Sequence, residues 1–171
     1  LLRELRRLLR REVAVAGEPV TFTHWEQARV EAGTARMLRM GMAPLPGEAA
    51  VVLDDALIDT LVEYLFGSEG RYYRAPGEAL RAPGHTGTRI ASRLLEHLMT
   101  AWKLAWATIL DIAPEAKGAI VDPTLFAAPD DAIFGVHLKL GLGERSGLIR
   151  ILLPYTLLQP VHDQLRAGFT V

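Results

Sequence analysis

The second half of this chain repeats the pattern of the first half. The segment LRMGMAPLPGEAAVVLDDALIDTLVEYLF begins at Leu38 and aligns without a gap with LKLGLGERSGLIRILLPYTLLQPVHDQLR, which begins at Leu138. The shared order of features matters more than the identities, because both segments read as a strand, a glycine-containing turn, a second strand and a capped helix. Identical residues fall at Leu38/Leu138, Gly41/Gly141, Gly47/Gly147, Leu53/Leu153, Leu57/Leu157 and Leu65/Leu165.

This repeat predicts an α/β fold made of two helix–strands–helix units with approximate two-fold symmetry. Strands joined by short turns should pair antiparallel, and the helices should cover the resulting, mainly antiparallel sheet. We expect a single domain over residues 1–171, with the repeats at about 1–67 and 88–168. A bridging loop at 68–87, rich in Gly and Pro, would join them.

In the first half, residues 1–13 have the leucine and arginine spacing of a basic amphipathic helix. Such a helix could pack on the core with a solvated charged face, or it could meet a membrane surface or an acidic partner. Extended segments at 13–22 should follow. Thr23 should then cap a helix over 24–32, with Glu26 in the capping-box position and Gly33 as the stop. Strands are expected at 35–40 and 48–54, and a helix at 56–66 capped by Asp54 or Asp55.

In the second half, Thr88 should open the longest helix, over 89–110. Extended segments should follow at 119–126 and 130–143, then a buried strand at 147–154 and a final helix at 155–168 that contains Pro160. The apolar face of the long helix should consist of Ile90, Leu94, Leu98, Trp102 and Ala105.

The composition excludes several classes of protein. The formal net charge of −1 argues against a general nucleic-acid binder. The absence of cysteine removes disulfides, thiolate metal sites and cysteine nucleophiles, and it fits a reducing compartment. No apolar run is long enough for a membrane-spanning helix. The chain begins LLRELRR without Met, so we expect a fragment of a longer protein.

Three stretches resemble the middle domain of the flagellar motor switch protein FliM. They are LPGEAAVVLDDALIDTLVEYLFGSEGR, DPTLFAAPDDAIFGVHLKL and GLIRILLPYTLLQPV. The family's Gly-Gly-x-Gly loop reads Gly67-Ser68-Glu69-Gly70 here, so a serine replaces the second glycine. The family's Asn-Pro-x-Phe-like turn corresponds to residues 122–126, and Pro154-Tyr155 precede the last helix. The resemblance implies the pseudo-symmetric fold shared with the CheC and CheX chemotaxis phosphatases.

The resemblance also implies a function that is not enzymatic. The domain would be a structural and switching subunit of the cytoplasmic C ring of the flagellar motor, at the inner face of the cell membrane. Its partners would be the rotor protein FliG and neighbouring FliM copies. Phosphorylated CheY would bind mainly through an N-terminal segment, and the ring component FliN through a C-terminal domain; neither part is recognised in this chain. A related secretion-ring component is a further alternative.

The expected partner-binding residues surround the Gly-rich loop: Phe66, Gly67, Ser68, Glu69, Gly70, Arg71, Tyr72 and Tyr73. Taken alone, Gly67 could serve only as a helix C-cap. Aromatic and arginine side chains beside accessible backbone are, however, typical of interface anchors, and in the family this loop contacts FliG.

The enzymatic alternative is a CheC-like phosphatase of phosphorylated CheY. That family places an acid and an amide on one helix, and here the matching positions are Ser92, Glu96 and Met99. Met99 cannot orient a water molecule by hydrogen bonding, so we expect no catalytic residues. Glu96 would instead pair with Arg93 or Lys103. The histidines are scattered without metal-ligand spacing, so we expect no metal and no cofactor.

Overall fold

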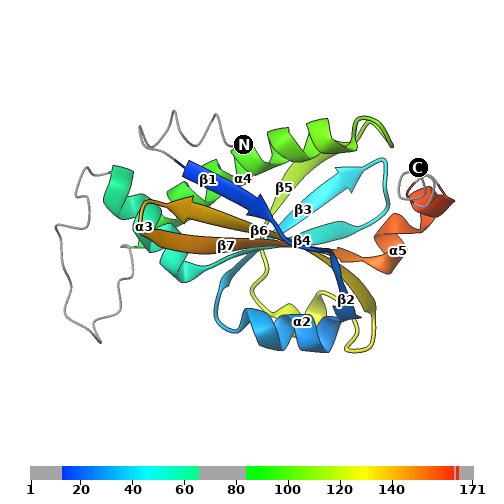
Figure 1. Ribbon diagram of the computed structural model, residues 1–171. Coiled ribbons are helices and arrows are strands. Elements are labelled where there is room, and N and C mark those ends of the chain that lie inside the picture. Colours follow the sequence, from blue (N-terminus) through cyan, green and yellow to red (C-terminus); the bar gives the residue numbers. More distant parts are fainter. Residues whose placement is uncertain (1–12, 66–83, 164, 166–171) are drawn as a thin grey trace.

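The centre of the structure is a seven-stranded antiparallel sheet (Figure 1). The structure is a computed structural model and describes residues 13–65, 84–163 and 165. The strand order is β1-β6-β7-β4-β3-β5, and β2 pairs with β6 beyond the end of β1. The strands are β1 (Val13–Gly17), β2 (Thr21–His24), β3 (Arg36–Ala43), β4 (Glu48–Leu53), β5 (Ala113–Ala119), β6 (Ala132–Leu142) and β7 (Arg145–Pro154). The helices are α2 (Trp25–Ala32), α3 (Asp55–Leu65), α4 (Gly84–Trp106) and α5 (Tyr155–Leu158), with 3-10 turns η1 (Pro123–Leu125) and η2 (Gln159–Val161).

The predicted two-fold axis passes through the centre of this sheet. Strands β4 and β7 pair antiparallel, and Val51 lies directly opposite Ile151, its counterpart in the repeat. A Cβ atom added to Gly147 would lie 2.5 Å from Cβ of Leu57, and one added to Gly47 would lie 3.8 Å from Cδ1 of Leu157. Each glycine therefore lies against the leucine of the other half, which explains why these four positions match in the sequence.

The edge strands cross between the two halves. Strand β5 precedes β6 in the second half but pairs with β3 of the first half. Strands β1 and β2 precede β3 in the first half but pair with β6 of the second half. Each half therefore supplies the outer strand of the other half's hairpin.

The main core lies between the sheet and the helices α3, α4 and α5 (Figure 1). Alternate residues of β4 and β7, among them Val51 and Ile151, point into this core, as expected for strands of period two. The helices contribute fully buried leucines, including Leu57, Leu94 and Leu157. None of the described helices is long and apolar enough to cross a membrane.

A smaller core lies on the opposite face of the sheet, beneath α2 (Figure 1). Trp25 is 1% exposed and packs with Ala28 and Ala32 against Ala50, Val52 and Leu152. These strand residues alternate with the ones in the main core, so the central strands are buried on both faces. That burial explains why β4 and β7 read as nearly continuous apolar runs rather than as alternating ones.

Several expectations about the elements of the second half are wrong. The second half contains β5 at 113–119, where no strand was expected, and the predicted extended segment at 119–126 contains the 3-10 turn η1. Helix α4 begins at Gly84, four residues before Thr88, and ends at Trp106. Ala105 is exposed, and Trp106 is buried in its place. The last helix changes to 3-10 geometry at Pro160, which cannot donate a backbone hydrogen bond.

Thr23 does not cap α2, and the predicted capping box is absent. Thr23 belongs to β2, its hydroxyl has no hydrogen-bond partner, and Glu26 pairs with Arg29 instead. The first backbone N–H groups of α2 donate to loop carbonyls, from Trp25 to Asp131 and from Glu26 to Pro129, at 2.9 and 3.0 Å. A loop distant in sequence therefore caps the helix, which no local pattern could predict.

The repeat alignment also needs a correction in the first strand of each hairpin. In β3 the partner of Val51 is Leu38, and in β6 the partner of Ile151 is Val136. The structural counterpart of Leu38 is thus Val136 rather than Leu138. The difference of two residues arises because the β3–β4 connection has four residues, Pro44 to Gly47, and the β6–β7 connection has two, Gly143 and Glu144.

Candidate protein-binding surfaces

The predicted contact residues Phe66, Gly67, Ser68, Glu69, Gly70, Arg71, Tyr72 and Tyr73 lie outside the described residues. The prediction that they bind a partner therefore stays a prediction. The structure does describe the helix that leads into them, α3, which ends at Leu65.

The last turn of α3 is tied to the β6–β7 hairpin. Glu63, only 8% exposed, accepts a hydrogen bond from Nη1 of Arg145 at 2.5 Å. The hydroxyl of the next residue, Tyr64, donates to the carbonyl of Leu142 at 2.8 Å. Because both contacts join α3 to the central sheet, the sheet sets the position from which the predicted contact loop departs.

An apolar cavity of about 400 Å³ opens between α4, α5 and the sheet. Its walls include Trp102, Trp106, Phe134 and Tyr155. Trp102 and Trp106 contact one another with ring centroids 5.9 Å apart, and Trp106 is buried. The indole N–H of Trp102 is buried without a hydrogen-bond partner. The lining is almost entirely hydrocarbon, so the cavity is suited to an apolar side chain rather than to a polar substrate.

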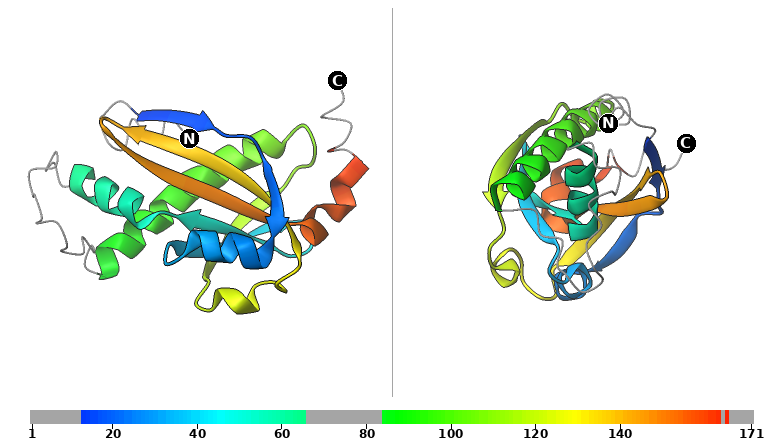
Figure 2. Two further views of the ribbon diagram at one scale, coloured as in Figure 1. Left: turned by 60° about the horizontal axis from the view of Figure 1, so that its bottom comes forward. Right: turned by 90° about the vertical axis from the view of Figure 1, so that its left-hand side faces the viewer.

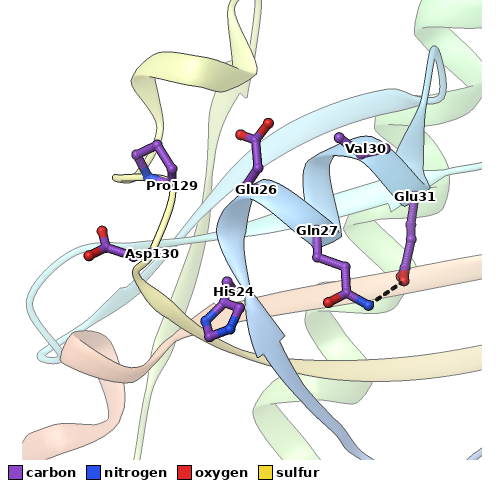
Figure 3. Close-up of a pocket in the computed structure, with 7 residues that line it drawn as sticks. All are labelled: His24, Glu26, Gln27, Val30, Glu31, Pro129 and Asp130. Atoms are coloured by element: carbon purple, nitrogen blue, oxygen red, sulfur yellow. Dashed lines mark hydrogen bonds between the residues drawn. The ribbon is translucent and has the colours of Figure 1, made fainter.

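A second candidate surface is formed by α2 and the loop of residues 120–131, called the η1 loop below. The loop lies beside α2, on the side of the molecule away from α4 (Figure 2). Glu26 and Val30 of α2 and Pro129 and Asp130 of the loop line a shallow hollow of about 460 Å³ (Figure 3). Within the hollow Gln27 donates to Glu31 at 3.1 Å.

The η1 loop is held by many hydrogen bonds. Asp122 accepts from the backbone N–H and the hydroxyl of Thr124 at 3.0 and 2.6 Å, and these bonds hold the pKa of the Asp122 carboxyl below its usual 3.8. The indole of Trp25 donates to the carbonyl of Pro123 at 2.8 Å and packs on Phe126. Asp131 accepts from the backbone N–H of Ala128 at 2.9 Å.

This rigid loop exposes two large apolar side chains. Val121 is 93% exposed and Leu125 is 82% exposed, the highest fractions among the exposed large hydrophobic residues in the described ranges. Because both groups belong to one short, hydrogen-bonded loop, the loop is a candidate contact surface. The Asp-Pro-Thr-Leu-Phe motif identified the turn, but nothing in the sequence distinguished its exposed residues from core residues.

The structure places the residues considered for phosphatase chemistry on α4. Ser92 and Glu96 are exposed, whereas Met99 is half-buried and packs against the main core. Lys103 pairs with Asp111 at 2.9 Å. The ion pairs of the described residues join Glu96 to neither Arg93 nor Lys103, so the expected pairing is wrong. No carboxamide lies at the position of Met99, so these residues do not form the acid–amide pair of that chemistry.

Three aspartates near the ends of elements have structural roles. Asp55 opens α3, Asp131 closes the turn of the η1 loop, and Asp54 accepts a hydrogen bond from the backbone N–H of Leu148 at 3.0 Å. Asp54 stands directly before α3, where a cap was expected, and its carboxylate also ties the start of this helix to β7. No group of three potential metal ligands occurs within the part of the chain that the structure describes.

The fold and these surfaces define a class: a two-fold duplicated α/β domain whose described residues form candidate contact surfaces. The comparisons with known proteins specify the class further. The model of the family "Flagellar motor switch protein FliM" matches residues 1–170, so the chain belongs to the FliM family.

Individual relatives agree with this assignment. The FliM protein of Pseudomonas aeruginosa is 28% identical over 130 residues, which are 75% of this chain and 39% of that protein. The chain therefore spans about two fifths of the length of that relative. The FliM middle domain of Vibrio alginolyticus has a TM-score of 0.80 at 21% identity and covers 95% of this chain and 90% of its own. A FliG–FliM complex from Helicobacter pylori has a TM-score of 0.81 at 14% identity, with 94% and 87% covered. These structures confirm the predicted fold.

Proposed function

We propose that this domain is a structural and switching subunit of the cytoplasmic C ring of the flagellar motor, at the inner face of the cell membrane. The observation that carries the proposal is the family match over residues 1–170, which extends through both repeats. In this function the domain binds FliG, packs against neighbouring FliM copies and re-aims FliG when phosphorylated CheY binds. CheY and FliN would bind mainly through parts of FliM that flank this domain.

The proposed FliG contact is the loop Phe66–Tyr73, as the resemblance implies. A Helicobacter pylori FliM domain with the same fold occurs in a complex with FliG. The ties of Glu63 to Arg145 and of Tyr64 to Leu142 support the proposal, because they anchor the helix that carries the loop. When the helix before a contact loop is fixed to the sheet, a rotation of the domain also moves the loop and its bound partner. A loop attached to a mobile helix would transmit such a rotation less well.

The proposed mechanism involves no catalysis by this domain. The helix that would carry phosphatase residues has Met99 in place of the amide, and its Glu96 is exposed. Switching would require two domain arrangements that are close in energy, and interfaces of moderate size between rigid domains can provide them.

Calorimetric titration of this chain against the middle domain of FliG tests the proposal. We expect binding by the parent chain and its loss in Gly70→Asp. A matched control is Gly17→Asp, because a side chain at exposed Gly17 would meet no atom within 4 Å. The control should bind FliG like the parent. If the parent does not bind FliG, the proposed partner is wrong; if Gly70→Asp binds normally, the assignment of the loop is wrong.

A further inference from the structure

The apolar cavity between α4, α5 and the sheet has an exposed apolar rim. Val20, which lines the cavity, is 54% exposed. Phe22 is 64% exposed and packs edge-on against Phe134 of the cavity wall, with ring centroids 5.0 Å apart. Phe134 in turn lies 6.2 Å from the ring of Tyr155 in the same wall. The cavity and its rim therefore form one continuous apolar surface, which the described residues leave partly in contact with water.

The end of the chain supplies one wall of this cavity. Leu158 of α5 lines the cavity, and so do His162 and Leu165, which follow the 3-10 turn η2. These three residues are separated by four and by three positions, which is the spacing of one helix face. A further step of four positions leads to Phe169. The periodicity therefore predicts that Phe169 follows Leu165 on the face that lines the cavity.

The side chain of Phe169 has the reach and the size to enter the cavity. Residues 166–171, RAGFTV, lie outside the described residues and begin directly after Leu165. In a helix, four residues correspond to about 6 Å along the axis, which is little more than one turn. An apolar cavity of about 150 Å³ is large enough to hold benzene. The volume of about 400 Å³ therefore has room for the phenyl ring of Phe169.

The walls of the cavity favour an aromatic side chain as the occupant. Trp102, Phe134 and Tyr155 line it, and aromatic rings attract one another beyond the effect of their buried area when their centroids are about 4.5–7 Å apart. A segment of the same chain also has an advantage over a free partner. Its effective concentration at the cavity is in the millimolar range, because the connection from Leu165 is short.

We propose that residues 166–171 dock on this cavity and that Phe169 inserts its ring between α4, α5 and the sheet. The proposal goes beyond the function proposed above, in which neither the cavity nor this segment takes part. Docking removes the apolar walls from water and closes the cavity to other apolar ligands. It also holds residues 166–171 against the domain.

Binding of the dye 1-anilinonaphthalene-8-sulfonate, which fluoresces on exposed apolar surface, tests the proposal. Phe169→Ala should open the cavity, so that the dye fluoresces more strongly with this variant than with the parent. The loss of a buried phenylalanine side chain should also lower Tm by roughly 3–12 °C in a chain of this size. A matched control is Thr170→Ala, because the next residue of a helix points about 100° away from the cavity. The control should resemble the parent in both measurements.

A double-mutant cycle with the cavity wall separates docking from a general loss of stability. Phe134→Leu changes the wall, whereas Phe126→Leu makes the same change in the smaller core beneath α2. In urea denaturation, the effects of Phe169→Ala and Phe134→Leu should not be additive, because the two rings touch in the docked state. The effects of Phe169→Ala and Phe126→Leu should be additive, because these residues lie on opposite faces of the sheet.

Three results would overturn the proposal. The first is equal dye binding by the parent and by Phe169→Ala, which would mean that the cavity is open to an outside ligand. The second is additivity of Phe169→Ala with Phe134→Leu. The third is dye fluorescence of the parent that rises on dilution of the protein, which would mean that a second copy, rather than residues 166–171, covers the cavity.

Discussion

Replacement of Gly147 by alanine should destabilise the domain, although alanine is normally preferred to glycine in a strand. The new Cβ atom would lie 2.5 Å from Cβ and 2.8 Å from Cδ1 of Leu57. The first of these atoms is attached directly to the backbone of α3, so no change of rotamer relieves the contact. Helix α3 and strand β7 must separate by about 1 Å to reach ordinary van der Waals distance.

Overpacking of this kind costs about 1–3 kcal/mol, and we expect a value in the upper part of that range. For a chain of this size each 1 kcal/mol lowers Tm by roughly 2–4 °C, so the melting temperature should fall by roughly 4–12 °C. Urea denaturation should show a lower midpoint with an unchanged slope, because the surface exposed on unfolding stays the same.

Two further variants make this prediction specific. Gly17→Ala should be neutral or should stabilise by up to about 1 kcal/mol, since its Cβ meets nothing within 4 Å and the substitution restricts the unfolded chain. Leu57→Ala should not rescue Gly147→Ala, because alanine at position 57 keeps the atom that lies closest. If Gly147→Ala proves as stable as the parent, the close approach of α3 to β7 described above does not exist, and the reasoning fails.

Three other predictions follow from the structure. Arg145→Gln should cost about 1–2 kcal/mol in urea denaturation, because it removes an ion pair from Glu63, which is 8% exposed, while Arg145 itself remains half in water; an unchanged midpoint would contradict this. The depressed pKa of Asp122 adds stability that is present above the unfolded-state value near 3.8 and is lost as pH falls through the folded-state value. Asp122→Asn should therefore be less stable than the parent at pH 7, and denaturation curves of the two should converge in strong acid. Separately expressed fragments 1–67 and 84–171 should each lack cooperative unfolding transitions and regain one on mixing, because their edge strands are exchanged; an independent transition in either fragment would refute the single-domain interpretation.

The central strands and their helices could be predicted from the sequence because burial on both faces leaves a strong local signal. Strands β4 and β7 are runs of apolar residues followed by helices with regular leucine spacing, and the repeat reinforced both. The edge strand β5 was missed because its sequence, Ala-Pro-Glu-Ala-Lys-Gly-Ala, lies largely in water and shows no alternation. Strand pairing there depends on the backbone of β3, which no local pattern reveals.

The contact surfaces were predictable only in part. The resemblance pointed to the loop Phe66–Tyr73, which lies outside the described residues, and identified the turn at Asp122–Phe126 without indicating its role. Val121 and Leu125 belong to a loop that the bonds of Trp25 to Pro123 and Asp131 hold beside α2, and these bonds join residues about a hundred positions apart. Periodicity within a window of ten to twenty residues contains no information about such contacts.

The crossed edge strands also bear on how a duplicated domain of this kind could arise. A single unfused copy would have a two-stranded hairpin whose edge has no neighbouring strand. It would also have a separate edge strand with no hairpin to pair with. In a dimer of two such copies, the edge strand of each copy could pair with the hairpin of the other. The ancestral form compatible with this sheet is therefore a strand-exchanged homodimer. Joining the two genes would replace a concentration-dependent encounter with an intramolecular one, at an effective concentration in the millimolar range for a short linker. The fused chain would also allow the two halves to diverge, so that α2 could be added to one face and the η1 loop fitted against it while the paired centre around Val51 and Ile151 remained the same.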